Sequence, residues 1–139
     1  MPSLTAIQSA ISKLPNESQS VAVLPGGTTG IGAYIAKALA ATFAHHGSKL
    51  RVYIVGRNAS RAEHVVAQCS ATSPGSDWRF VQTPDLTLVS EVDRCCAEII
   101  RQEKEAVAEG GEVPKIDMLY MTYSYFLLKE RKSTCNRSV

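Results

Sequence analysis

The sequence lacks the features expected of a secreted, membrane-spanning or metal-binding protein. No apolar segment is long enough for a signal peptide or a membrane span, and the histidines and cysteines show no metal-site spacing. No C-x-x-C pair is present among the cysteines, which are Cys69, Cys95, Cys96 and Cys135. We therefore expect reduced thiols in an intracellular, cytoplasmic protein with no metal and no membrane partner.

The sequence also lacks a marked excess of charge. It has 15 lysines and arginines against 13 aspartates and glutamates, a formal net charge of +2. Nothing in this balance predicts a nucleic-acid partner, so a small molecule is the expected ligand. With 139 residues the chain can form one domain but is too short for two.

The stretch from Ser20 to Gly32 predicts a strand, a tight turn and the start of a helix. Its apolar run Val21–Leu24 is typical of a parallel strand buried on both faces, and Pro25 ends that run. The turn is rich in residues that let the backbone approach a ligand closely, namely Gly26, Gly27, Gly30 and Gly32. Because unpaired amides at a helix N-terminus attract phosphate, we interpret this turn as a pyrophosphate-binding site.

Two alternatives bear on this turn. A glycine-rich stretch can be an ordinary turn, but this one lies between an apolar strand and an amphipathic helix, which favours nucleotide binding. A phosphate-loop NTPase is excluded because no Gly-Lys-Ser/Thr follows the turn.

Apolar residues at helical spacing predict helices on both sides of the turn. The first helix covers residues 4–14, with Ser3 as N-cap and Pro15 as its stop, and is expected to cover one end of the sheet. The second helix ends at Gly47 and carries an apolar stripe formed by Ile31, Ile35, Leu39 and Phe43.

Two further helices follow. One presents Val65 and Val66 to the core. The other is capped by Thr87, frays at residues 103–105, and carries its apolar face on Leu88, Val92, Cys95, Cys96, Ile99 and Ile100. That placement favours core packing for both cysteines over a redox pair.

Strands alternate with these helices along the chain. The predicted strands are residues 21–24, 50–55, 78–81 and 116–121. Alternation of this kind requires right-handed crossovers and a parallel sheet covered by helices on both faces. The sequence therefore predicts an α/β, three-layer, Rossmann-like doubly wound parallel sheet with strand order 3-2-1-4, as in half of a dinucleotide-binding fold.

The end of the second predicted strand indicates which dinucleotide is bound. An acid at this position would accept a hydrogen bond from a free ribose 2′-hydroxyl, but the sequence has Gly56-Arg57-Asn58, with Arg61 one helical turn further on. A guanidinium suits a phosphate dianion, although Arg57 could also be a solvated loop charge. The missing acid also disfavours a Rossmann-like methyltransferase.

The spacing Gly26-x-x-x-Gly30-x-Gly32 resembles the T-G-x-x-x-G-x-G turn of the short-chain dehydrogenase/reductase family. Pro25 stands where that family usually has Thr, and the lost hydroxyl is expected to loosen the turn without removing the phosphate cradle. The segment V-G-R-N resembles the NADP-preferring version of the family. The resemblance implies NADP as cofactor, held by Gly26, Thr28, Thr29, Gly30, Ile31, Gly32, Arg57 and Asn58.

The resemblance continues into the second half of the sequence. Asp85-Leu86 matches the pair that contacts adenine in the family, although Asp85 could instead be a helix N-terminal charge. The segment I-D-M-L-Y-M-T-Y-S agrees with the family pattern at I-D-x-L. It differs further on, where Met121 and Thr122 replace the family's Asn-Asn. A divergent fungal branch, often found in secondary-metabolite gene clusters, is similar here, which adds Thr122 to the implied cofactor contacts.

The family's catalytic Ser and Tyr-x-x-x-Lys follow strands that this sequence does not contain. Tyr125 and Lys129 have the Tyr-x-x-x-Lys spacing but come directly off the fourth strand, so we interpret them as a coincidence and assign no catalytic residue. The expected division is an N-terminal helix and loop (1–19), an NADP-binding half-domain (20–124) and a disordered tail (125–139) that resembles a truncated end.

Three hypotheses follow from these patterns. The chain is an NADP-dependent oxidoreductase of this family, working in fungal secondary metabolism, or a non-catalytic dinucleotide-binding or regulatory protein, or a truncated gene product without activity. In all three cases the fourth strand becomes an apolar edge strand, through which self-association is expected.

Overall fold

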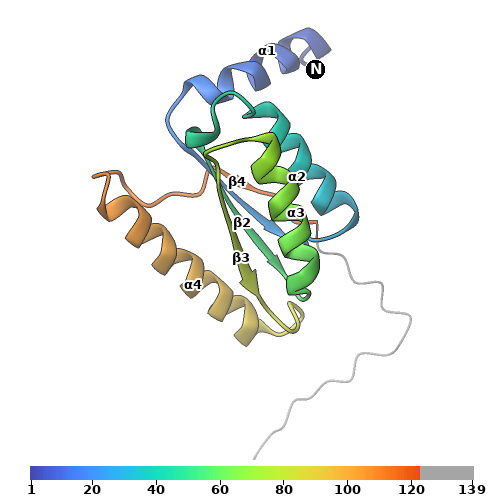
Figure 1. Ribbon diagram of the computed structural model, residues 1–139, viewed down its shortest axis with the longest axis vertical. Helices are drawn as coiled ribbons and strands as arrows, with labels where there is room; N and C mark the ends of the chain where they lie inside the picture. Colours follow the sequence, from blue (N-terminus) through green and yellow to red (C-terminus); the bar gives the residue numbers. More distant parts are fainter. Residues whose placement is uncertain (123–139) are drawn as a thin grey trace, which may run out of the picture.

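The computed structural model describes residues 1–122, and the predicted tail with Tyr125, Lys129 and Cys135 lies outside them. Four parallel strands form one sheet in the order β3-β2-β1-β4 (Figure 1). In chain order they are β1 (Ser20–Pro25), β2 (Leu50–Gly56), β3 (Asp77–Gln82) and β4 (Met118–Leu119). The predicted α/β class and strand order are thereby confirmed.

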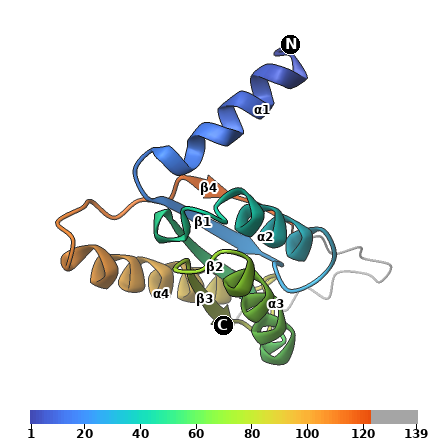
Figure 2. The ribbon, with the colours of Figure 1, turned by 45° about the horizontal axis from the view of Figure 1, so that its top comes forward.

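Helices cover the sheet on both faces and complete three layers (Figure 2). One face carries α2 (Gly30–Thr42) and α3 (Ala59–Thr72), and the other carries α4 (Val89–Ala108). Alternate residues of β1 divide between them: Ala22 and Leu24 pack with α2 and α3, whereas Val21 and Val23 pack with α4. The strand is buried on both faces, as its continuous apolar run predicts.

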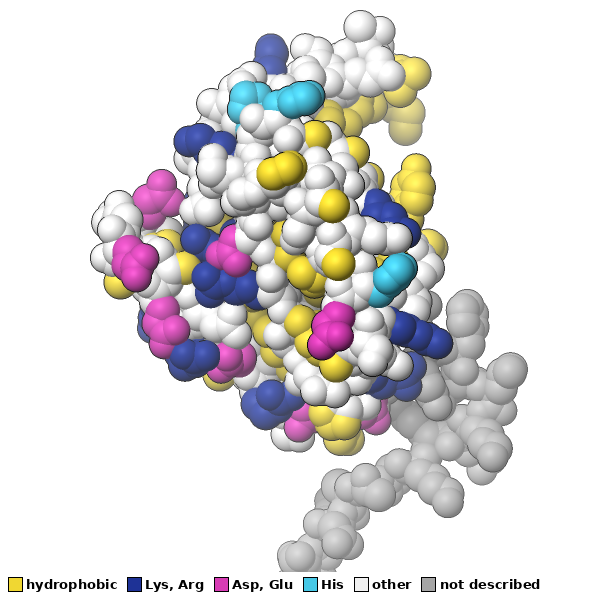
Figure 3. Space-filling view, in the orientation of Figure 1, with side chains coloured by type: hydrophobic (Ala, Val, Ile, Leu, Met, Phe, Trp, Pro, Cys, Tyr) yellow, Lys and Arg dark blue, Asp and Glu magenta, His cyan; other side chains and the backbone are white. Residues whose placement is uncertain are grey.

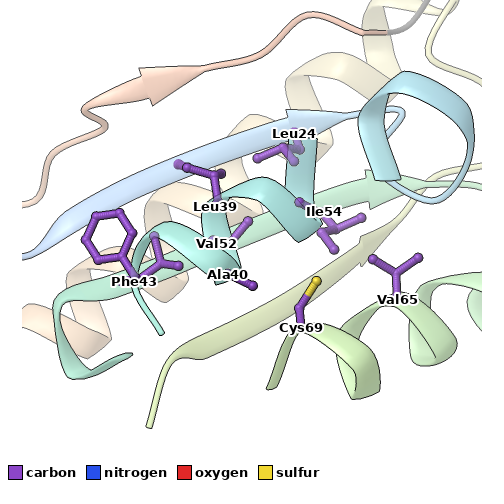
Figure 4. Packing of buried hydrophobic residues seen from close by; sticks show 11 residues of the cluster. Leu24, Leu39, Ala40, Phe43, Val52, Ile54, Val65 and Cys69 are labelled. Atoms are coloured by element: carbon purple, nitrogen blue, oxygen red, sulfur yellow. The ribbon is translucent and has the colours of Figure 1, made fainter. Parts of the chain in front are cut away.

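The larger apolar cluster lies between the sheet and the α2–α3 layer (Figure 4). The figure shows Leu39, Ala40 and Phe43 of this layer close to Val52 and Ile54 of β2. The buried face of α2 is built mainly from small residues, which let the helix approach the sheet closely.

The predicted apolar stripe of α2 is partly wrong. Leu39 and Phe43 are buried and Ile35 packs against the same core cluster, as predicted, but the side chain of Ile31 is 74% exposed. The helix also ends at Thr42 rather than at Gly47, which lies in a separate 3-10 turn (Gly47–Lys49). Ala36 and Ala40 are fully buried beside Leu39 and complete the packing face.

The N-terminal helix α1 (Leu4–Lys13) forms where predicted but does not cover the sheet. Ser3 caps it, with its hydroxyl oxygen accepting from the Ala6 amide at 3.2 Å. None of its residues is buried, and Figure 2 shows the helix projecting from the domain. A 3-10 turn (Leu14–Asn16) with a buried Pro15 redirects the chain before the helix reaches the core.

The helix α4 differs from prediction at both ends. It begins after Leu88 without a side-chain cap, and it does not fray at residues 103–105 but continues to Ala108. Glu103 is buried and accepts hydrogen bonds from Arg51 Nη1 at 2.9 Å and the Tyr53 hydroxyl at 2.8 Å. Along the helix, Cys95 is buried as expected, but Cys96 is exposed.

The fourth strand is shorter than predicted, but the residues on either side of it also form hydrogen bonds to β1. The Asp117 carboxylate accepts from the Val21 amide at 2.8 Å, and the amides of Asp117 and Tyr120 donate to the carbonyls of Val21 and Val23. Within residues 1–122, no helix is both long and apolar enough to cross a membrane.

Candidate functional site

A cleft of about 300 Å³ opens at the carboxyl ends of β1 and β2. In an open parallel sheet this edge is where ligands bind, at the point where the strand order reverses. The cleft is lined by Gly26, Thr28, Thr29, Gly30, Ile31, Gly32, Gly56, Arg57, Thr83, Leu86 and Thr122. It therefore brings together all the predicted cofactor contacts except Asn58 and Asp85.

The glycine turn forms the floor of the cleft. Gly26 and Gly30 adopt positive φ angles of 81° and 55°, which strain any residue with a Cβ. Gly26 is fixed to the neighbouring strand, with its amide donating to the Val55 carbonyl at 2.8 Å. A Cβ on Gly32 would lie 2.7 Å from Thr122 Oγ1 and would also clash with the Gly26 carbonyl, so the backbone alone fits here.

The first turn of α2 faces the cleft with its amides free of a side-chain cap. Thr29 is the N-cap residue, and its side chain makes no capping bond within the described chain. The first amides of a helix have no partner inside the helix, and together they carry partial positive charge. This arrangement suits an anionic group such as a pyrophosphate.

Thr122 closes the cleft from the end of β4. Its hydroxyl donates to the Pro25 carbonyl oxygen at 2.7 Å, and its side chain lies against the position that a Cβ of Gly32 would take. The segment after β4, the end of β1 and the first turn of α2 therefore meet at one point.

Arg57 lies at the rim, directly after β2. Its side chain is exposed, and its carbonyl accepts a hydrogen bond from Gln82 Nε2 at 3.2 Å. Among residues 1–122, no carboxylate forms an ion pair with its guanidinium. The guanidinium is thus available to an anion in the cleft.

Two predicted residues, Asn58 and Asp85, do not line the cleft but form hydrogen bonds within the segments beside it. Asn58 is the N-cap of α3, with its Oδ1 accepting from the Arg61 amide at 3.0 Å. Asp85 accepts from the amide and the hydroxyl of Thr87, at 2.8 Å and 2.7 Å. The hydrogen bond from the Thr87 amide has the largest effect and lowers the pKa of Asp85. The bond from the Thr87 hydroxyl and the positive charge of Arg57 lower this pKa further. Thr87 therefore closes a turn with Asp85 instead of capping α4.

Sequence reasoning missed Thr83, which lines the cleft beside Leu86. Thr83 is fully buried, and its amide donates to the Gly56 carbonyl at 2.9 Å. Its hydroxyl donates to Glu91 Oε2 at 3.1 Å. A signal was available, because a hydroxyl residue directly after the third parallel strand must lie at the same sheet edge as the glycine turn.

No family model matches the chain, but comparison with known proteins finds similar sequences and folds. The short-chain dehydrogenase/reductase SAT2 of Stachybotrys chartarum is 58% identical over 134 residues, covering 96% of this chain and 38% of that protein. The chain belongs to the short-chain dehydrogenase/reductase family. Oxidoreductase andH of Emericella variicolor is 37% identical over 108 residues, covering 77% of this chain and 30% of that protein.

Solved structures show the same fold. An alcohol dehydrogenase from the archaeon Thermococcus sibiricus, complexed with 5-hydroxy-NADP, matches with a TM-score of 0.51 and 20% identity over 73% of this chain and 36% of that one. The bulky-bulky ketone specific alcohol dehydrogenase from Comamonas testosteroni matches with a TM-score of 0.53 and 18% identity over 84% of this chain and 40% of that one. This short-chain dehydrogenase/reductase chain thus spans well under half the length of these relatives.

Proposed function

We propose that this chain forms the NADP-binding part of an NADP-dependent oxidoreductase of the short-chain dehydrogenase/reductase type. The observation that carries the proposal is that the glycine turn after β1 and Arg57 after β2 line one cleft. The first provides a site for a pyrophosphate, and the second provides a cation where a carboxylate would be needed to select NAD.

The residues present fit such a cofactor. The free amides at the start of α2 would hold the pyrophosphate, over a turn that has no room for a Cβ at Gly32. The guanidinium of Arg57 would pair with the phosphate on the adenosine ribose, and Leu86 would offer apolar contact to the adenine. When bound, NADPH supplies the hydride for reduction of a carbonyl group.

A charge placed at Ile31 tests the site without disturbing the core. Ile31 lines the cleft and is 74% exposed, so Ile31→Glu should leave the fold intact, and an acid in the first turn even favours the helix. Next to a pyrophosphate, however, the new carboxylate should weaken NADPH binding by at least about tenfold.

Tyr34→Glu provides the matched control. Tyr34 is also 74% exposed on α2 but does not line the cleft. NADPH affinity is read from nucleotide fluorescence and folding from circular dichroism. Equal NADPH affinities for the two folded variants would contradict the proposed position of the cofactor.

We also propose that the oxidoreductase works in fungal secondary-metabolite biosynthesis. In support, the similar SAT2 and andH are proteins of the fungi Stachybotrys chartarum and Emericella variicolor. Deletion of the gene in its host should remove or alter a secondary metabolite in extracts analysed by mass spectrometry. An unchanged metabolite profile, with the gene shown to be expressed, would contradict this role.

Finally, we propose that isolated copies of the chain self-associate through β4. This strand pairs with β1 alone among the described strands. An apolar groove of about 370 Å³ runs between it and α4, and Leu119 and Met121 on its wall are 59% and 70% exposed. A second copy can cover this groove and pair with the free strand edge at the same time, which favours it as the occupant.

A further inference from the structure

The N-terminal helix α1 carries an apolar face that residues 1–122 leave largely uncovered. Leu4, Ile7 and Ile11 lie at helical spacing on one side of the helix, and they are 70%, 43% and 45% exposed. Figure 3, in which α1 lies at the top, shows hydrophobic side chains at the surface along one side of this helix. The opposite side carries small polar residues such as Thr5 and Ser9, so α1 is amphipathic.

A helix of this length gains stability from packing against another surface. The helix α1 has ten residues and none of them is buried. Isolated helices shorter than about 12–15 residues are marginal in water. Contacts hold α1 mainly at its two ends, through the Ser3 cap and through Leu14, which packs against the core cluster. The apolar face between these ends therefore favours a partner.

The apolar groove between β4 and α4 has the chemistry of such a partner. It has a volume of about 370 Å³, and no Asp, Glu, Lys or Arg lines it. Its walls present exposed apolar side chains from both elements, namely Val92 and Ile100 on α4 and Leu119 on β4. A groove of this kind suits a helix with apolar residues at positions i, i+3 and i+7, which is the spacing of Leu4, Ile7 and Ile11.

The position of α1 points to a second copy as the partner. The 3-10 turn with the buried Pro15 directs α1 away from the sheet of its own chain. Figure 2 shows the helix extending past β4, the strand at the edge of the sheet. A second copy that pairs with β4 therefore meets this helix. Charge is complementary as well, because Lys13 is the only charged residue of α1, whereas α4 has five acidic and three basic residues.

We propose that α1 of each copy docks in the β4–α4 groove of a second copy, so that two copies exchange their N-terminal helices. This inference rests on the self-association proposed above and names the segment that fills the groove. Each copy supplies one helix and one groove, so the exchange closes at a dimer. Pairing of the strand edges alone would leave both apolar surfaces in water, whereas the exchange buries them together.

A double substitution on the apolar face of α1 tests the exchange in the 139-residue chain. Ile7→Gln/Ile11→Gln keeps good helix formers in α1 but removes two apolar contacts, so self-association should weaken by at least about tenfold. Thr5→Gln/Ser9→Gln is the matched control on the opposite side of the helix and should associate like the wild type. Light scattering over a concentration series measures association, and circular dichroism confirms that each variant is folded.

The thiol of Cys96 provides a second readout, because it is exposed and lines the groove. Alkylation by iodoacetamide is followed by mass spectrometry of the peptide that contains Cys96. In the wild type, alkylation should slow by at least about fivefold as rising protein concentration drives association. In Ile7→Gln/Ile11→Gln it should stay fast over the same range. The buried Cys69 should react slowly throughout, and fast alkylation of Cys69 would reveal unfolding.

Equal self-association of Ile7→Gln/Ile11→Gln and the wild type would overturn the helix exchange, while association through β4 would stand. A rate of Cys96 alkylation that does not depend on concentration in an associating wild type would overturn it too. A wild type that stays monomeric would contradict the proposed self-association itself. In that case, slow alkylation of Cys96 at every concentration would show that the chain covers its own groove.

Discussion

The hydroxyl of Thr122 donates a 2.7 Å hydrogen bond to the carbonyl oxygen of Pro25, joining the end of β4 to the end of β1. Pro25 stands where the family usually has a threonine, and the loss of that hydroxyl is expected to loosen the turn. In the structure the hydroxyl of Thr122 reaches the same turn from the segment that follows β4. The two departures from the family pattern, at Pro25 and Thr122, are therefore in direct contact.

Removing this hydroxyl tests its role. Thr122→Val keeps the shape of the side chain but leaves the Pro25 carbonyl without its donor, so the free energy of unfolding should fall by about 1 kcal/mol. Dinucleotide affinity should fall as well, because the bond holds the side chain of Thr122, which lines the cleft, against Gly32. Urea denaturation and NADPH titration measure the two effects. Thr122→Ser should restore both, and a Thr122→Val protein identical to wild type would contradict the role.

A second prediction concerns the buried carboxylate at the opposite edge of the sheet. Glu103 is 3% exposed and binds Arg51 and Tyr53. Glu103→Ala leaves the Tyr53 hydroxyl without its acceptor and deprives Arg51 of one of its two carboxylates, which should cost about 3 kcal/mol of unfolding free energy. The exposed pair of Arg101 with Glu105 is the control, since Glu105→Ala should change stability by less than about 1 kcal/mol.

Dinucleotide affinity should not change in Glu103→Ala, provided that the variant is folded. The network lies where Arg51 pairs with Asp77 at the start of β2 and β3, whereas the cleft lies at the ends of the strands. Equal stability losses for the Glu103 and Glu105 variants would show that the buried network contributes no more than a surface pair.

The third prediction concerns the apolar edge. Leu119→Lys should reduce self-association, because it places a charge on the exposed strand and in the wall of the groove. Val113→Lys is the control, since Val113 is 79% exposed but does not line the groove. Light scattering over a concentration series measures the mean mass. A wild-type chain that stays monomeric at high concentration would contradict the proposed association.

Much of the fold could be predicted from sequence because two local signals are strong. The continuous apolar run of β1 is typical of a strand covered on both sides, and its neighbour β2 is equally buried. Glycine after the first strand and hydroxyl or basic residues after the others then lie at one sheet edge, since parallel strands end together. This reasoning placed Gly26 and Arg57 at one edge, and the family resemblance added Thr122; all three line the same cleft.

The rest depended on tertiary contacts that leave no local pattern. Periodicity predicts that the apolar residues of α1, and Ile31 of α2, pack against the sheet. It does not show whether a given turn of a helix reaches the sheet, and neither α1 nor Ile31 does so. Glu103 looks like part of a solvated charged run, and only the arrival of Arg51 and Tyr53 from β2 makes its burial favourable. For the same reason Asn58 and Asp85, although next to the cleft, hold the backbone of their own loops.

Titration of the 139-residue chain with NADPH and NADH tests the central claim most directly, with nucleotide fluorescence as the readout and Arg57→Asp as the variant. The wild type should prefer NADPH by about tenfold to a hundredfold, the value of one charge-assisted contact of about 1.5–3 kcal/mol. Arg57→Asp should reverse this preference, because a carboxylate repels the phosphate and accepts from a free ribose hydroxyl. Lys13→Asp, on the exposed helix α1, should have no effect. Equal affinities of the wild type for the two nucleotides would contradict the account.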